Sequence, residues 1–429
     1  MTDYTRIARK ITTTLFVNQS LVSAGFIATS TVSAIIGAGL SGNPALAGAP
    51  AAVQQLGAAF AALLVSANME RTGRRKGLAL GLVVGALGAG LAAKAVIDGS
   101  FALFLGGLAL MGVALAAMQL GRFAAAEVHP AKSRGKAISY VVIGGAVGSV
   151  LGPQLVGPSS QWAHQAGLNE LAGPYLVALV IYALAALVIT IWLRPDPRDI
   201  GAKITEMDAE SVGQTGPTRT VSQILRTPGA FVAVSAMVIG QVVMVILMGI
   251  TSLYMKNHQH TLTGISLVIS AHTFGMFAFS IISGRLTDRW GRGAVIMTGA
   301  GFLVVACLLA PLSTNILPLA LALLLLGIGW NFCYVGGSTL LSDQLSPPER
   351  PKTQGTNDLL VGLATATASF SSGLMYASMG YNVVGVIGAA IALIPLGLTG
   401  WWLIKNGDCR AKLRSSQLIK TPVETSQRR

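Results

Sequence analysis

Long apolar stretches recur along the whole chain and are separated by short polar segments. Each has 20 residues or more, about the length that an α-helix needs to cross a hydrocarbon core ~30 Å thick. The alternation of apolar and polar positions that is typical of outer-membrane barrel strands is absent. The pattern therefore predicts an all-α membrane protein with twelve transmembrane helices, at residues 14–40, 49–69, 77–96, 101–126, 137–158, 171–193, 229–254, 263–283, 293–312, 316–341, 355–378 and 382–404.

The longest internal polar stretch divides these spans into two groups of six. It contains the turn-forming sequence RPDPRD and several acidic residues, which favour a flexible linker over a folded domain. The first apolar stretch is too long for a signal peptide, so we expect it to be an uncleaved span. The predicted organisation is an N-terminal six-helix bundle at 1–193, a cytoplasmic linker at 194–228, a C-terminal six-helix bundle at 229–404 and a cytoplasmic tail at 405–429.

Composition and charge placement agree with this interpretation. The chain is 52% hydrophobic and only 11% charged, whereas a soluble protein carries about 25% charged residues. The net charge of +14 does not indicate nucleic acid, because all Lys and Arg residues except Lys94 and Lys256 fall on one side of the predicted spans. By the positive-inside rule, both termini and the linker are expected in the cytoplasm, with the lipid bilayer as the surroundings.

The two halves also repeat each other in sequence. Residues 70–74 (ERTGR) match residues 288–292 (DRWGR) at an offset of 218, and residues 130–135 are echoed by residues 349–355 at about 220. Parallel six-helix repeats imply alternating access, with the substrate site between the halves near the midplane.

The repeated loop carries a candidate gating motif. Glycine permits a tight turn that presents arginines beside an acidic residue at a helix end, and such an ionic cluster can hold one side closed, although the residues could also be solvated loop charges. The stretch 284–292 resembles the signature of the major facilitator superfamily, and the first-half copy departs from it at Ser66 and Glu70. The resemblance implies the major facilitator fold. The motif residues are Glu70, Arg71, Gly73, Arg74, Gly284, Asp288, Arg289, Gly291 and Arg292.

A second motif lies in the fifth span. Pro153 removes a backbone donor and bends a helix, and the glycines around it permit close packing. The motif, formed by Gly148, Gly152, Pro153 and Gly157, resembles that of facilitator-type drug/proton antiporters. Efflux and simple helix packing are both compatible with it.

Ionisable groups are nearly absent from the span interiors, where they are costly and usually functional. Glu127, Asp358 and Arg122 lie near helix ends, so neither a central carboxylate relay nor a highly charged substrate is expected. Neither a nucleophile–base pair nor a cofactor loop is visible, so we predict no enzyme activity and no prosthetic group. Polar residues that could hydrogen-bond a neutral ligand or a neighbouring helix are Asn18, Gln19, Gln119, Gln241, Trp330 and Asn331.

His272 is the one histidine well inside a predicted span. Met276 follows it at the spacing that shares a helix face, and Met244 and Met248 have the same spacing on the preceding span. Thioethers and an imidazole form a soft, uncharged ligand set that suits Cu(I), although methionine also serves as adaptable core filler. Met237, Met244, Met248 and Met255 share one helical face, and His258 and His260 follow beyond its outer end. Met255, His258 and His260 form a candidate capture site there.

These two spaced pairs resemble the signature of the CcoA-like copper importers, bacterial facilitators that supply copper for assembly of cbb3-type cytochrome c oxidase. The resemblance implies copper uptake across the bacterial inner membrane, with Met244, Met248, His272 and Met276 as metal ligands and copper chaperones as candidate partners. The wider family includes members that look like riboflavin transporters and lack these pairs. The leading hypothesis is a copper importer, and the alternative is an organic-solute transporter, either a drug/proton antiporter or a riboflavin carrier.

Overall fold

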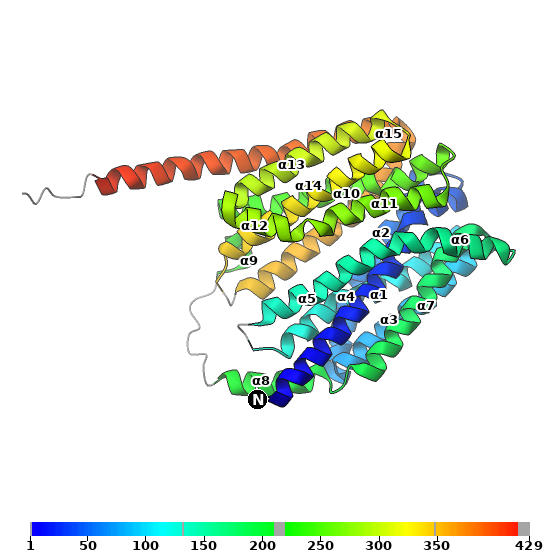
Figure 1. Cartoon of the computed structure of the whole chain (residues 1–429), viewed down its shortest axis with the longest axis horizontal. Coiled ribbons are helices and arrows are strands. Elements are labelled where there is room, and N and C mark those ends of the chain that lie inside the picture. Colours follow the sequence, from blue (N-terminus) through cyan, green and yellow to red (C-terminus); the bar gives the residue numbers. More distant parts are fainter. Residues whose placement is uncertain (1, 131–132, 210–218, 347–348, 419–429) are drawn as a thin grey trace, which may run out of the picture.

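The computed structural model describes residues 2–130, 133–209, 219–346 and 349–418, and these ranges are helical with short 3₁₀ turns and no strand (Figure 1). The N-terminal half contains α1 (Thr2–Ser41), α2 (Ala49–Thr72), α3 (Arg74–Asp98), α4 (Phe101–Glu127), α5 (Arg134–Leu151), α6 (Val156–Gln165) and α7 (Gly173–Trp192), with 3₁₀ turns η1 (Pro44–Leu46), η3 (Gly152–Leu155) and η4 (Glu170–Ala172). The C-terminal half contains α10 (Pro228–Asn257), α11 (Leu262–Ala278), α12 (Ser280–Trp290), α13 (Arg292–Leu309), η5 (Ala310–Leu312), α14 (Ile316–Asp343) and α15 (Arg350–Leu418).

The number of spans agrees with the apolar pattern when one bent helix pair and one interrupted helix are taken into account. Within the described ranges, ten helical runs are long and apolar enough to cross a membrane, and α11 with α12, bent by 42°, makes an eleventh. The run in α15 is interrupted at Gly380, whose φ of 75° lies outside the helical region, so this one run provides two spans. The described residues thus account for the twelve expected spans.

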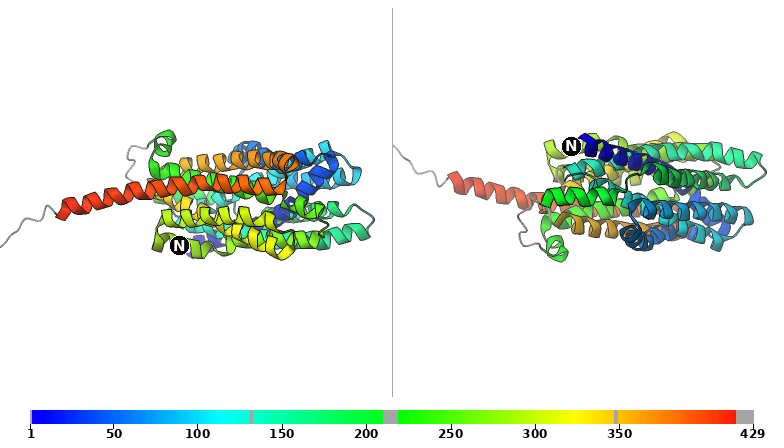
Figure 2. Two further views of the ribbon diagram at one scale, coloured as in Figure 1. Left: turned by 90° about the horizontal axis from the view of Figure 1, so that it is seen from above. Right: turned by 90° about the horizontal axis from the view of Figure 1, so that it is seen from below.

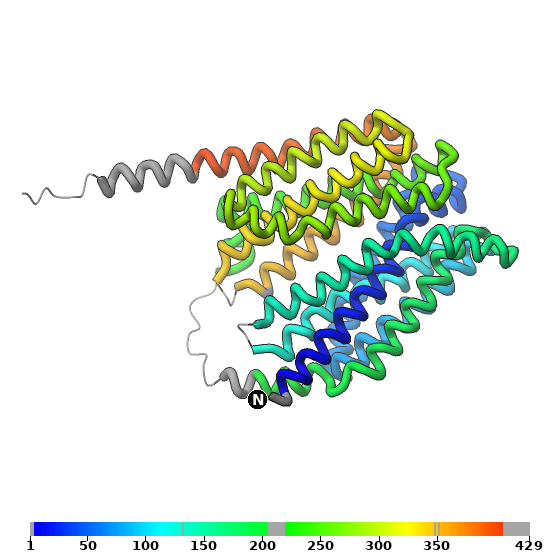
Figure 3. Tube along the Cα trace, in the orientation of Figure 1, coloured from blue at the N-terminus to red at the C-terminus, as the bar shows by residue number. Residues whose placement is uncertain are grey.

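The two halves lie side by side, and their helices run roughly along the long axis of the molecule (Figures 1 and 2). The chain trace in Figure 3 shows the first bundle in blue to green and the second in green to orange. The N-terminus, α8 (Pro197–Ala209) and α9 (Val221–Leu225) lie at the same end of the bundle, which we call the linker end. We call the opposite end, which carries η1 and α6, the far end.

Large apolar side chains cover the outer surface of both halves. Phe60, Leu64 and Leu317 are each at least 70% exposed, as are Ile281 and Leu312. Such a surface would be unstable in water and is stable in contact with lipid chains. The exposed side chains and the apolar spans together define a multi-pass membrane protein.

Glycines bring helices within each half into backbone contact, and the helix 5 motif is part of this packing. A Cβ on Gly148 or Gly152 would collide with the backbone of α1, and Gly157 lies against Thr263 of the other half. Pro153 lies in η3, where the α-helix gives way to a 3₁₀ turn, as expected from its missing N–H. The motif therefore shapes and packs the fifth span in this structure.

The linker is more ordered than its composition predicts. Its first part forms α8, and its last part forms α9 with a capping box between Thr220 and Gln223. The side chain of Asp196 accepts hydrogen bonds from the backbone N–H groups of Arg74 and Arg75, both at 3.0 Å, which fixes the linker to the first turn of α3. The described part of the predicted tail, up to Leu418, continues α15.

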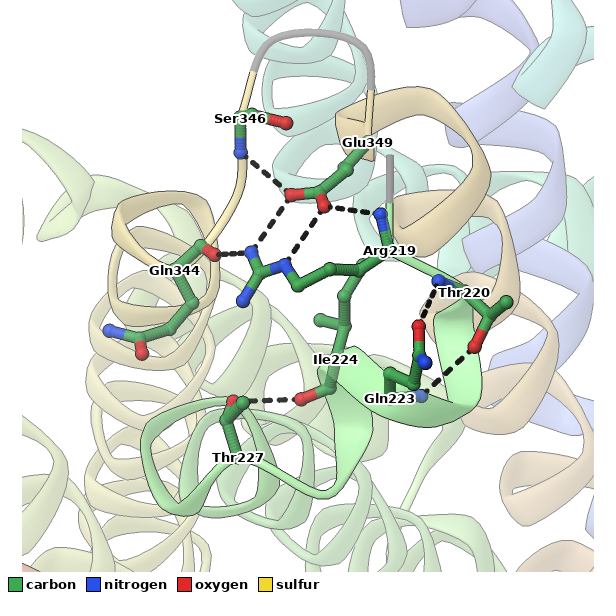
Figure 4. A network of polar contacts seen from close by, with 8 residues as sticks. All are labelled: Arg219, Thr220, Gln223, Ile224, Thr227, Gln344, Ser346 and Glu349. Carbon is green, nitrogen blue, oxygen red and sulfur yellow. Dashed lines mark hydrogen bonds and ion pairs between the residues drawn. The ribbon is translucent and has the colours of Figure 1, made fainter. Parts of the chain in front are cut away.

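A compact polar network fixes the other end of the linker to the C-terminal half (Figure 4). The guanidinium of Arg219 donates to both carboxylate oxygens of Glu349 at 2.9 Å and to the carbonyl of Gln344 at 2.6 Å. The backbone N–H groups of Arg219 and Ser346 also donate to Glu349. The linker is thus tied to both halves at the linker end.

The two copies of the gating motif form equivalent ionic clusters, each within its own half. Gly73 and Gly291 have φ values of 95° and 91°, so glycine is required for both turns. Arg74 forms a two-point ion pair with Glu127, and its repeat counterpart Arg292 pairs with Asp343 at 2.8 Å. The remaining motif residues, Glu70, Arg71, Gly284, Asp288 and Arg289, lie around these turns at the linker end, and of these Asp288 also contacts Arg292, at 3.6 Å.

Candidate functional site

A cavity of about 350 Å³ lies between the halves, in the middle of the bundle. Its wall comes from α1, α2, α4 and α5 on one side and from α10, α11, α14 and α15 on the other. The described residues that line it include no charged side chain. A site of this kind favours neutral cargo or an ion held by neutral ligands.

All four residues of the two spaced pairs line this cavity, Met244 and Met248 from α10 and His272 and Met276 from α11. His272 is fully buried, and its Nδ1 lies 3.0 Å from the carbonyl oxygen of Leu323. Because a carbonyl can only accept, Nδ1 carries the proton and Nε2 keeps its lone pair. That Nε2 atom has no hydrogen-bond partner among the described residues.

The helix that carries His272 and Met276 is held against α14 by backbone contact. A Cβ on Gly327 would collide with the carbonyl of His272, and one on Gly275 would collide with the carbonyl of Leu324. The side-chain amide of Asn331 also donates to the carbonyl of Met276 at 2.6 Å. These contacts fix the orientation of the His272 ring relative to the cavity.

The polar residues expected to contact a ligand divide into two groups. Gln19, Gln119, Gln241 and Trp330 line the cavity, and the indole N–H of Trp330 donates to Gln241 Oε1 at 2.7 Å. Asn331 and Asn18 are buried outside this lining, and the Oδ1 of Asn18 has no hydrogen-bond partner among the described residues.

The cavity also contains residues that the sequence interpretation passed over, chiefly Gln54, Gln55 and Phe26 of the N-terminal half. The repeat of the two halves indicates Gln54, because the offset of 218 makes it the counterpart of His272. A pattern of soft-metal ligands does not include these residues, because glutamine and phenylalanine are poor ligands for a soft ion.

The three outer residues are joined through their backbone, since the N–H groups of His258 and His260 both donate to the carbonyl of Met255 at 3.1 Å, but their side chains have different surroundings. Met255 is fully buried in the core, and His258 bonds the carbonyl of Tyr254 at 2.8 Å. His260 bonds the carbonyl of Thr314 and lines a separate pocket of about 470 Å³ at the far end, which His164 also lines. In the described part of the chain, no three His, Cys, Asp or Glu side chains are close enough to hold a metal ion.

Polar contacts join the halves at both ends of the cavity. Towards the far end, Gln154 donates to Ser270 at 2.7 Å, and Lys256 forms an ion pair with Glu170 at 3.3 Å. Gly48 there packs directly against the backbone of Ser369. At the linker end, Arg122 of α4 forms an ion pair with Asp358 of α15 at 2.5 Å. A cargo must pass one of these closures to enter and the other to leave.

Two repeated six-helix halves around a central cavity are the architecture of a secondary transporter. Comparison with known families agrees with this class. The model of the Major Facilitator Superfamily matches residues 15–256 and 232–427, and the chain belongs to this family. It is therefore a transporter and not an enzyme.

Relatives of this chain include bacterial transporters of similar length. The uncharacterized MFS-type transporter YdeG of Bacillus subtilis is 36% identical over 90% of this chain and 91% of its own length. The riboflavin transporter RfnT of Brucella anthropi is 30% identical over 92% of this chain and 97% of its own. Among solved structures, a bacterial homolog of the lysosomal transporter Spinster in an inward-facing, occupied conformation aligns with a TM-score of 0.68 at 14% identity, covering 90% of this chain and 95% of its own.

Proposed function

We propose that this transporter imports copper across the bacterial inner membrane into the cytoplasm, in support of cytochrome c oxidase assembly. The observation that carries the proposal is the state of His272, a fully buried imidazole whose Nε2 lone pair is free beside a cavity lined by Met244, Met248 and Met276. In a metal-binding histidine, one ring nitrogen usually donates its N–H to a carbonyl, which leaves the lone pair of the other nitrogen for the metal.

The ligand set favours copper over other metals. Three thioether sulfurs and one neutral imidazole are soft donors that suit Cu(I) and bind Mg²⁺, Ca²⁺ or Mn²⁺ poorly. Neutral donors also hold a monovalent ion less tightly than thiolates, and Cys307 and Cys333 are buried elsewhere in the core. Weak, uncharged coordination allows release after each transport cycle.

The route follows from the two closures. With the linker end in the cytoplasm, as the charge distribution predicts, copper enters from the far end and binds at the four ligands. It leaves when the pair between Arg122 and Asp358 opens. Copper chaperones are candidate donors or acceptors at the two ends.

The test is uptake of radioactive copper by cells that produce the wild type, His272→Ala or Met248→Ala at equal membrane levels. Loss of one ligand should reduce the initial rate at least about tenfold, as changes at metal sites commonly do. Met379→Ala is the matched control, because Met379 is 54% exposed and lies outside the cavity lining. Normal copper uptake by both ligand variants would show that the ligand assignment is wrong.

A riboflavin carrier is the second candidate, and the similarity to RfnT over nearly the whole chain favours it. The glutamines and the indole of Trp330 in the lining could bind a neutral aromatic solute. Uptake of labelled riboflavin by the same cells separates the candidates. Riboflavin uptake that survives His272→Ala, without copper uptake by the wild type, would support the second candidate and exclude the first.

A further inference from the structure

The repeat that relates the two halves extends to the residues that line the cavity. On α1 and α10, an offset of 218 relates Ser23 to Gln241, Phe26 to Met244 and Ser30 to Met248, and all six line the cavity. On α2 and α11, the same offset relates Gln54 to His272, and both again line the cavity. Three of the four proposed ligand positions, Met244, Met248 and His272, therefore have counterparts on the opposite wall.

Among the described residues, nine buried side-chain polar atoms lack a hydrogen-bond partner, and two of these atoms belong to residues that line the cavity, Gln54 and its counterpart His272. Gln54 is 3% exposed and His272 is 0% exposed. The Nε2 atom of each is buried without a hydrogen-bond partner among the described residues. Buried polar atoms are nearly always paired, so an unpaired one in a cavity wall indicates a group that arrives from outside the protein. Here two such atoms occupy equivalent positions on opposite walls.

The two walls differ in chemistry at these equivalent positions. Among the described lining residues, the N-terminal wall has one thioether, that of Met118, and its sulfur accepts a hydrogen bond from Ser23 at 3.4 Å. The wall of the C-terminal half offers sulfur and imidazole nitrogen, which bind a soft cation. The wall of the N-terminal half offers the primary amide of Gln54, whose NH₂ group donates hydrogen bonds and cannot coordinate a cation. The cavity volume of about 350 Å³ also falls in the range of small-molecule sites, ~300–1,000 Å³, and a bare ion would fill little of it.

We propose that Gln54 forms a second subsite, for a neutral group that donates and accepts hydrogen bonds and that travels with the metal. This inference rests on the proposed copper function and specifies its substrate as a small copper complex. The complex binds His272 and the methionines through the metal, and it binds Gln54 through an amide-like or thioamide-like part of its organic ligand. That ligand adds no positive charge to the metal, because the described lining carries no counter-charge for it.

The test uses the full chain in proteoliposomes and radioactive Cu(I) kept reduced by ascorbate. The metal is supplied alone, with thiourea, or with tetramethylthiourea. Both carriers are neutral and bind Cu(I) through sulfur, but only thiourea has N–H groups that can pair with a primary amide. Wild type is compared with Gln54→Leu, with Gln54→Met and with Gln161→Leu, a control in which the same change is made at an exposed glutamine of the far-end pocket.

We expect the wild type and Gln161→Leu to show a KM roughly two- to tenfold lower for the thiourea complex than for the tetramethylthiourea complex, the range that one neutral hydrogen bond provides. Both Gln54 variants should lose this preference while still taking up Cu(I) supplied alone, which shows that they are folded. Equal KM values in the wild type, or a preference that persists in both Gln54 variants, would overturn the second subsite and leave copper import intact. No copper uptake by the wild type in any form would overturn the proposed function itself.

Discussion

The position of His272 depends on a backbone carbonyl and on two glycines. The carbonyl of Leu323 fixes the proton on Nδ1, and Gly327 and Gly275 allow α11 and α14 to approach until their backbones touch. In lipid, where hydrophobic burial between helices contributes little, this close packing is a main source of helix association. A change at a glycine with no functional group can therefore disturb the ligand.

The corresponding prediction concerns Gly327→Ala. A Cβ there collides with the backbone of His272, so α11 must shift, and such overpacking typically costs about 1–3 kcal/mol. We expect a lower Tm in detergent and slower copper uptake than in the wild type. The control is Gly301→Ala, because a Cβ on Gly301 has no atom within 4 Å. Equal Tm values for the two variants would contradict the packing argument.

At the scale of elements, the linker acts as a strap with a fixed attachment to each half. Asp196 holds its first part to the first turn of α3, and Glu349 holds its last part through Arg219. The Arg219 guanidinium, together with the backbone N–H groups of Ser346 and Arg219, holds the pKa of Glu349 well below its usual range. A buried carboxylate with this many donors is a rigid attachment point.

Because folding lowers the pKa of Glu349, the stability that this residue contributes should depend on pH. Because pairing lowers the pKa of Glu349, its contribution to stability is present above the ordinary carboxyl pKa of about 4.3 and is lost only as the pH falls through the lower pKa of the folded state. We expect Glu349→Gln to lower the Tm by an amount that stays constant between pH 8 and pH 6. That difference in Tm should shrink as the pH falls below about 4.3 towards the lower pKa of the folded state, because the unfolded chain then takes up a proton that the folded protein does not. A difference in Tm that stays the same above and below this pH would mean that Glu349 titrates normally in the folded protein.

At the scale of the whole molecule, the two halves are joined differently at the two ends. The far end has backbone contact, a hydrogen bond and an ion pair, whereas the linker end has the pair between Arg122 and Asp358. Both side chains of this pair are partly exposed, so its contribution is that of an accessible ion pair, roughly 0.2–1 kcal/mol. A contact of this strength can open and close during each cycle.

Exchanging the charges of Arg122 and Asp358 tests whether this ion pair closes the linker end. Arg122→Asp and Asp358→Arg each place two like charges at the contact, and we expect either variant to favour the state that is open at the linker end. An energy of this size shifts the populations about two- to fivefold. The measurement is labelling of a cysteine introduced at a cavity-lining position, by a thiol reagent applied from the linker side. The double exchange should restore the wild-type labelling rate, and failure to restore it would exclude direct pairing.

The spans and the repeat were predictable because hydropathy and basic residues report directly on lipid contact and membrane side. Helical spacing predicted that each of the two pairs shares a helix face, and the repeat predicted a site between the halves, where His272 and the three methionines line the cavity. The helix α8 was not predictable in this way, because its polar sequence is ordered by contacts such as that of Asp196 with the start of α3. In the outer group, α10 extends to Asn257 and keeps the side chain of Met255 inside the core, which the sequence pattern did not indicate. The unpaired state of Gln54 depends on tertiary neighbours that no local pattern specifies.

The uncharged lining of the cavity has a consequence for energetics. A cargo of charge +1 that crosses between these walls meets no fixed carboxylate to neutralise it, so each transport cycle moves one net charge through the electric field of the membrane. With the interior negative, that movement releases about 2.3 kcal/mol for every 100 mV. The resting membrane potential alone would then drive accumulation of the cargo, without a coupled proton.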